Sequence, residues 1–215
     1  MTYTGQQLNE PQADVWMQLV YEAKNSALGD AVTICRAAFL RAIGRGTGGR
    51  EYSWLHQTML AFTSAMISIE VRRPNGELKY SIGHTNAFHM LADFEYNPDT
   101  EKYSFTIDAR WKKAFDGREY SLVDLKQRLR IGRGQDMAKA LQRLVATSSD
   151  SVQRYGLDWL KAKLQYSGRM YDFRGALDCA MREMERVEII AAGGRIGLST
   201  RGKEQVVWTK LKPSA

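Results

Sequence analysis

The residue types that most often catalyse reactions or hold metals form no recognisable site in this sequence. The histidines (His56, His84, His89) and cysteines (Cys35, Cys179) lack metal-ligand spacing and include no CxxC pair. No Ser-His-Asp or Cys-His arrangement can be inferred, and His84 and His89 do not form the His-hydrophobe-His site of a nicking replication protein. We therefore expect no enzymatic activity, no metal and no cofactor. Both cysteines are interpreted as core residues of a protein in a reducing compartment.

Gly44, Gly46 and Gly49 match GxGxxG, the glycine motif of dinucleotide-binding sites. A dinucleotide site requires a strand directly before this motif and a βαβ unit around it. Here the motif lies between two expected helices. We interpret the glycines as a sharp turn with positive φ, and no GxxxxGK[ST] sequence indicates a phosphate loop.

The distribution of charge favours a polyanionic partner. Residues 1–109 hold 9 Lys+Arg and 12 Asp+Glu, a net charge of −3, whereas residues 110–215 hold 22 and 12, a net charge of +10. Lysine and arginine that neutralise phosphates release counterions, which gives affinity for nucleic acid of any sequence. The alternative is a basic surface that only keeps the protein soluble.

Helix and turn signals predict the elements of the first half. Asn9, Pro11 and Gln12 mark the start of a helix that should end by Gly29. A short strand (32–34), a short helix (36–43) and a longer helix (51–64) are expected next. Strands at 66–72 and 78–82 flank the hairpin signal Asn75-Gly76, and two more, 87–96 and 102–109, complete a sizeable antiparallel sheet.

The second half is expected to repeat this plan. Helices are predicted at 135–147, 157–164 and 170–186, followed by a hairpin with strands 187–192 and 205–211. Leu55, Met59, Phe62 and Met66 have the same 4-3-4 spacing as the set Phe173, Leu177, Ala180, Met184. A helix pair followed by a β-hairpin in each half predicts an α+β fold with two tandem winged-helix domains, residues 1–112 and 113–215, each a helix-turn-helix followed by a β-hairpin wing.

In a winged helix, the second helix of the pair enters the major groove of DNA while the wing and nearby turns contact phosphates. Arg169 and Arg174 are the expected base-reading residues, because arginine contacts guanine O6 and N7 with two hydrogen bonds. For each candidate, the alternative is the solvated face of an amphipathic helix. The predicted DNA-binding residues are Arg45, Thr47, Arg50, Tyr52, His56, Arg72, Arg73, Lys161, Lys163, Ser167, Arg169, Tyr171, Arg174, Arg182, Arg195, Arg201 and Lys203.

Several short segments resemble the start of the TrfA plasmid replication initiators. They are Met1-Thr2-Tyr3-Thr4-Gly5, Val15-Trp16, Ala23-Lys24, Gly29 and Thr33, Phe39-Leu40, Gly49-Arg50, Tyr52 and Leu55. The resemblance is most specific at this end and fades beyond about Gly83. It implies binding to directly repeated origin sequences (iterons), opening of AT-rich DNA and recruitment of host DnaA and the replicative helicase. It further implies plasmid copy control through monomers that bind the repeats and dimers that do not.

The sequence departs from the TrfA initiators at the sliding-clamp motif, and other features predict where the protein acts. Gln7-Leu8-Asn9-Glu10 does not complete the sliding-clamp motif of longer members. The sequence has no apolar stretch of membrane-spanning length and no signal peptide, so we expect a cytoplasmic protein without membrane contact. Two other functions remain open: a winged-helix transcriptional repressor or autoregulator without initiator activity, and a module whose basic half binds an acidic protein.

Overall fold

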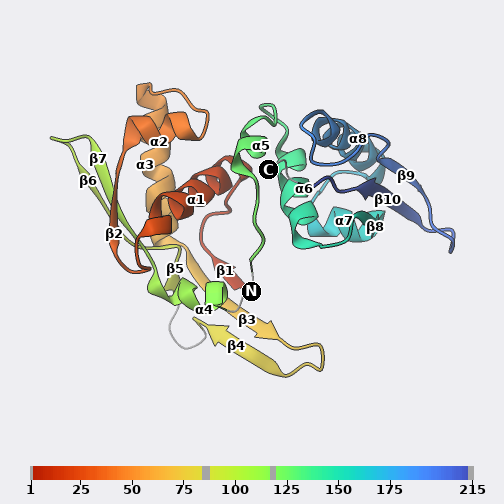
Figure 1. Cartoon of the computed structure of the whole chain (residues 1–215), viewed down its shortest axis with the longest axis horizontal. Helices are drawn as coiled ribbons and strands as arrows, with labels where there is room; N and C mark the ends of the chain where they lie inside the picture. The colour runs from red at the N-terminus through yellow and green to blue at the C-terminus, as the bar shows by residue number, and fades with distance from the viewer. Residues whose placement is uncertain (1, 84–87, 117–119, 213–215) are drawn as a thin grey trace. The chain divides into compact units, whose positions relative to one another are not determined.

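The computed structural model describes residues 2–83, 88–116 and 120–212 (Figure 1). Its contacts divide the chain into two compact units, Met1–Glu119 and Tyr120–Ala215. The short helix α4 (Lys112–Asp116) was not expected, and its Ala114 is buried in the core of the first unit. We therefore place the domain boundary after α4 rather than at residue 112. His84 and Ala87 lie outside the described residues.

The helices of the first unit form where capping and periodicity predict them. Asn9 and Gln12 form a reciprocal capping box at the start of α1 (Glu10–Glu22), with both N···O distances 3.0 Å. A 3-10 turn (Ala23–Asn25), β2 (Ala31–Cys35), α2 (Arg36–Ala42) and α3 (Gly49–Ser64) follow. Gly44 adopts the positive φ expected of the turn between α2 and α3, whereas Gly46 and Gly49 do not.

The strands of the first unit form two sheets rather than the single sheet expected. β1 (Thr2–Thr4), β3 (Met66–Arg72) and β4 (Leu78–Ile82) lie in one sheet, with β5 (Phe88–His89) also paired to β3. The second sheet has the order β2-β7-β6, from β6 (Leu91–Asn97) and β7 (Lys102–Ile107). A 3-10 turn (Ala109–Trp111) follows β7 and leads into α4.

This pairing changes which hairpin is the wing of the first unit. In the second unit the strand before the helix pair joins the sheet of the wing hairpin, and in the first unit the strand in that position, β2, pairs with β7. The wing is therefore the β6–β7 hairpin. The β3–β4 hairpin, predicted to be the wing, is an insertion paired with β1, and Figure 1 shows the two hairpins projecting in different directions.

The second unit has the compact winged-helix order. After α5 (Leu125–Leu129), which was not predicted, come α6 (Asp136–Thr147), β8 (Val152–Gly156), α7 (Leu157–Lys163) and α8 (Met170–Arg186). The wing strands are β9 (Arg195–Leu198) and β10 (Glu204–Thr209), and the sheet order is β8-β10-β9. β8 was also missed, because its sequence Val-Gln-Arg-Tyr-Gly lacks the run of apolar and β-branched residues that marked the equally short β2.

The predicted strand at 187–192 is wrong. Val187 ends α8, and Glu188 has a φ of 62°, which turns the chain back on itself. Ile189 and Ile190 are then 5% and 1% exposed in the core, joined to the sheet by one bridge between Ile190 and Lys210. These two β-branched residues therefore belong to the core of the second unit. The strand β9 begins three residues beyond the end of the predicted strand.

The helical spacing that suggested the repeat holds for three of its four positions in α3. Leu55, Met59 and Phe62 are fully buried, but α3 ends at Ser64, and Met66 is a half-exposed strand residue. All four residues of the α8 set are buried, from Phe173 to Met184. Both units nevertheless contain a strand, a short helix and a long helix in that order.

Glu183 joins α8 to the segment after α5 and should make stability depend on pH. Its carboxylate accepts hydrogen bonds from the Gly132 amide (2.6 Å) and from the Arg186 guanidinium (2.7 Å). The bonds from Arg186 are the largest cause of its lowered pKa, although partial burial acts in the opposite direction. The carboxylate therefore stabilises the fold above the pKa of an unfolded glutamate, and this stabilisation is lost as pH falls through the lower folded pKa.

We expect Glu183→Gln to lower the free energy of unfolding by about 1–2 kcal/mol at pH 7, because charge-assisted hydrogen bonds are lost. The difference from the wild type should shrink as pH falls below about 4. Denaturant unfolding at both pH values measures it. Glu188→Gln is the control, because the Glu188 side chain is exposed and its 3.7 Å distance from Arg130 is too long for a strong hydrogen bond. A Glu183→Gln deficit that persists unchanged at low pH would contradict the assignment.

Candidate nucleic-acid interface

Basic side chains are concentrated in the second unit. Residues 1–119 hold 13 Lys+Arg and 14 Asp+Glu, a net charge of −1, and residues 120–215 hold 18 and 10, a net charge of +8. The wings differ in the same way. Residues 91–107 carry four acidic residues and one lysine, whereas residues 195–209 carry three basic residues and one glutamate. The wing of the second unit is therefore much the better suited to contact phosphates.

The start of α8 presents large side chains to solvent. Arg169 is the N-cap residue, and its side chain is 93% exposed, with a weak 3.8 Å approach to Asp172. Tyr171, in the first helical turn, is 82% exposed. Ser167 and Lys163, in or near the preceding turn, are exposed, and Lys161 is half-buried. These five predicted residues lie along one stretch of the helix pair.

The tip of the second wing is the other exposed basic site. Arg195 begins β9, and Arg201 and Lys203 lie in or beside the tight turn between β9 and β10; all three are exposed. The turn is closed by hydrogen bonds between Ser199 and Lys203, and Gly202 has a φ of 70°. Figure 1 shows this hairpin projecting from the unit beside α8.

Arg174 is not a free base-reading side chain. Its guanidinium forms two hydrogen bonds with Glu204 of β10, through Nε at 3.1 Å and through Nη2. Any contact between Arg174 and DNA requires this carboxylate to be exchanged for a phosphate or base. Glu204 was not among the predicted residues, although it stands out as the acidic residue of an otherwise basic hairpin. Arg182 is similarly paired with Asp178 at 2.7 Å, but its side chain remains 76% exposed.

The predicted residues of the first unit divide into packed and exposed groups. Arg45 donates to Glu51 at 2.6 Å, and its guanidinium lies 3.6 Å from the centre of the Trp54 ring. Tyr52 lies under the Arg36 guanidinium. His56 packs between α3 and the β6–β7 sheet, 5.3 Å from the Phe94 ring.

The remaining candidates of the first unit lie at two separate places. Arg50 is exposed in the first turn of α3, and Thr47 is half-buried in the turn before it. Arg72 and Arg73 belong to the inserted β3–β4 hairpin and not to the wing, and they pair with Glu70 and Glu77 at 3.3 and 3.4 Å. The structure therefore does not bring the seven candidates of this unit together on one surface.

The cysteines are exposed and not core residues as predicted. Cys35 lies at the end of β2, and Cys179 lies on the solvent face of α8. Their small size and moderate polarity let them occupy either environment, so residue type alone could not decide. Across the described ranges, no group of three or more His, Cys, Asp or Glu side chains could hold a metal ion. Within the same ranges, no helix is both long and apolar enough to cross a membrane.

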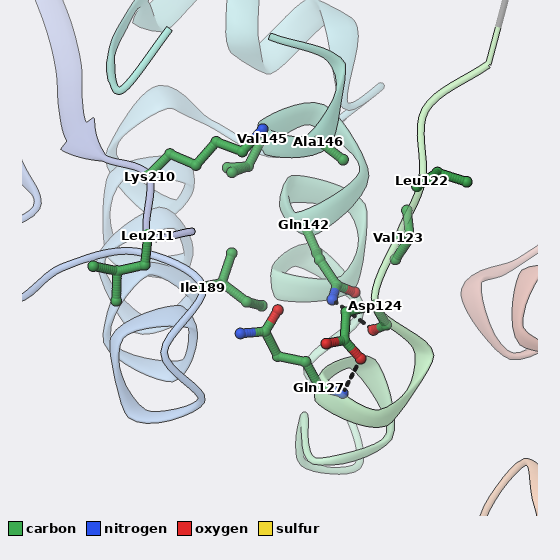
Figure 2. Close-up of a pocket in the computed structure, with 10 residues that line it drawn as sticks. All are labelled: Leu122, Val123, Asp124, Gln127, Gln142, Val145, Ala146, Ile189, Lys210 and Leu211. Atoms are coloured by element: carbon green, nitrogen blue, oxygen red, sulfur yellow. Dashed lines mark hydrogen bonds between the residues drawn. The ribbon is translucent and has the colours of Figure 1, made fainter. Parts of the chain in front are cut away.

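The second unit has a small pocket of about 110 Å³ (Figure 2), and none of the predicted DNA-binding residues lines it. It lies beside α6, and its walls are mostly apolar, with Leu122, Val145 and Ile189 among them. Lys210, the basic residue in its lining, donates to the Ser148 carbonyl at 2.9 Å. The pocket therefore offers no surface suited to a phosphate backbone.

The fold defines a tandem winged-helix protein. No protein-family model and no curated protein matches the sequence. Among solved structures, the chain is similar to the Pi initiator protein in complex with iteron DNA, with a TM-score of 0.61, 16% identity and coverage of 98% of this chain and 97% of that chain.

A second similarity is to domains 2 and 3 of RctB, with a TM-score of 0.61, 11% identity and coverage of 97% of this chain and 85% of that chain. Another structure of the same RctB domains gives a TM-score of 0.58, 12% identity, and coverage of 97% and 86%. At these identities the likeness establishes the shared fold, and it extends over both units.

Proposed function

We propose that this protein binds duplex DNA at repeated origin sequences and initiates plasmid replication there. The observation that carries the proposal is the second unit, in which the exposed start of α8 and the exposed basic wing tip belong to one winged helix. In this fold those two elements are the ones that contact bases and phosphates. The similarity to an initiator solved with iteron DNA, over almost the whole of both chains, supports repeated origin sites as the target.

The two units are expected to contribute unequally. The net charge of +8 and the basic wing make the second unit the principal source of affinity, with Arg169 as the best placed base-reading residue. In the first unit, Arg50 at the start of α3 is the best placed contact, and the acidic β6–β7 wing should stay away from phosphates. We expect one DNA-binding helix from each unit to occupy successive major grooves, which are about 34 Å apart, and such binding would suit a long non-palindromic repeat.

The finer parts of the proposal follow from the initiator assignment. They are recruitment of host DnaA and the replicative helicase, control of copy number through a monomer–dimer equilibrium, and action in the cytoplasm. We infer no enzymatic step. Incubation with supercoiled origin DNA and Mg²⁺ should therefore give no relaxed product, and nicking would contradict this part.

Selection of bound duplexes from a random pool, followed by footprinting, tests DNA recognition. We expect enrichment of a non-palindromic site spanning about two major grooves, occupied by one protein molecule. A short palindrome bound by a dimer, or no enrichment at low salt, would overturn the proposal. A repressor shares the fold, so the two functions are separated by asking whether a plasmid with this gene as its sole initiator is retained in cells.

The wing tip should supply affinity without sequence preference. Changing both Arg201 and Lys203 to alanine removes two exposed cations, so binding to selected and random duplexes should weaken by similar factors. The slope of log K against log salt should decrease in magnitude by about 2. Titrations at several salt concentrations measure both effects. A loss confined to the selected duplex would instead assign these residues to base readout.

A further inference from the structure

We infer that Gly175 sets how deeply α8 enters the major groove, by letting the helix backbone approach the base pairs. The inference rests on the proposed DNA binding and names the point of closest approach within it. Gly175 is the sixth residue of α8, it is exposed, and it was not among the residues selected from the sequence.

The fold itself gives no reason for glycine at this position. Gly175 does not have a positive φ, and a β-carbon built on it would have no atom within 4 Å other than those of its chain neighbours and its own helical backbone. Alanine would therefore fit without strain. Glycine in the interior of a helix is destabilising relative to alanine, because it loses more backbone freedom on folding. A destabilising residue without a packing role indicates a constraint imposed from outside the unit.

The neighbours of Gly175 on the helix surface indicate what imposes it. Phe173, Leu177 and Ala180 are buried on one side of α8, so Gly175 lies on the opposite, exposed side. Tyr171 lies one turn before it and Cys179 one turn after it, and Arg182 follows. Gly175 and Cys179 thus form a stretch of two small residues between two long polar side chains. Asp172 and Asp178, three residues before and after Gly175, flank this stretch, and their carboxylates face Arg169 at 3.8 Å and Arg182 at 2.7 Å.

The dimensions of B-DNA make such a low stretch useful. The major groove is about 12 Å wide, and a helix with its side chains is about 10–12 Å in diameter. A helix therefore fits with little room, and a single added side chain at the point of contact must move it outward. We expect the base pairs opposite Gly175 to lie against the backbone of α8, while Tyr171 and Arg182 reach to either side.

Replacement of Gly175 by alanine and by leucine separates this role from folding. Both residues favour helix, so the midpoint of thermal unfolding should rise by about 2–8 °C in the alanine variant. Affinity for the duplex selected by the wild-type protein should fall severalfold for alanine and at least tenfold for leucine. Stability and binding therefore change in opposite directions, which a folding defect cannot produce.

The matched control is Gly156→Ala, a second exposed glycine with no atom within 4 Å of an added β-carbon, outside α8. Its affinity should stay within about twofold of the wild type. Cys179 provides a second readout, because DNA bound against this face should cover its thiol. The selected duplex should therefore slow the reaction of Cys179 with N-ethylmaleimide, which mass spectrometry measures. The full chain is used throughout.

The outcomes distinguish this inference from the proposed function. If the wild-type protein binds the selected duplex and both Gly175 variants bind it equally well, the inference is overturned and DNA binding stands. Equal reaction of Cys179 with and without saturating duplex also overturns it. If the wild-type protein enriches no duplex, both proposals fall together.

Discussion

Arg169→Ala is expected to weaken binding to the selected duplex by about 1–3 kcal/mol, roughly 5- to 150-fold. Arg169 is the N-cap residue of α8, where residues of a recognition helix meet base edges, and its side chain is 93% exposed. Its approach to Asp172, at 3.8 Å, is too long for a strong hydrogen bond. Little is therefore lost when the guanidinium turns toward guanine, in contrast to Arg174, which must first leave Glu204.

The expected signature of Arg169 is a change in specificity as well as affinity. The variant should accept other base pairs at one position of the selected site, and its affinity for random DNA should fall much less. Competition titrations with single-base variants of the site measure this. Arg133→Ala is the matched control, since Arg133 is an exposed arginine outside α8 and the wing. Equal losses on selected and random duplexes would refute base readout by Arg169.

Trp208→Ala is expected to destabilise the second unit by about 3–5 kcal/mol, enough to unfold much of a marginally stable domain. Trp208 is 1% exposed and is the largest fully buried side chain in the described parts of the chain. Its ring packs on Tyr155, and its indole N–H donates to Gln153 Oε1 at 3.0 Å. Alanine leaves a cavity and also removes the donor to a buried amide oxygen.

Denaturant unfolding followed by circular dichroism measures this loss. Trp159→Ala is the matched control, because Trp159 also packs on Tyr155, in a stacked arrangement, but is 50% exposed. We expect the control to lose about 1 kcal/mol or less. Similar losses for both variants would mean that Trp208 does not anchor the core of the second unit. DNA binding by Trp208→Ala should fall in proportion to the unfolded fraction.

The exposed basic residues of the candidate site could be predicted from the sequence, but their ion-pair partners could not. The positions of Arg169 and Tyr171 follow from the start of α8, which was predicted at Met170 as observed. The pairing of Arg174 with Glu204 spans 30 residues and depends on β10 lying beside α8. Helical position alone gives no information about such a partner.

The sequence by itself determined the local features of this protein. The Asn9 and Gln12 side chains specify the start of α1, apolar periodicity specifies α6 and α8, and the excess of Lys and Arg in the second half needs no coordinates to be recognised. These are interactions between residues three or four apart, or simple sums over a segment, so they survive in any context.

Tertiary structure alone decided which hairpin is the wing of the first unit and where residues 187–190 lie. Strands β3 and β4 follow α3 directly, yet β2 takes β7 as its partner, some 70 residues along the chain. Ile189 and Ile190 are of a residue type typical of strands, but they are buried in the core of the second unit. Both outcomes depend on which apolar faces and strand edges remain uncovered once the helices have packed, and a local pattern does not contain that information.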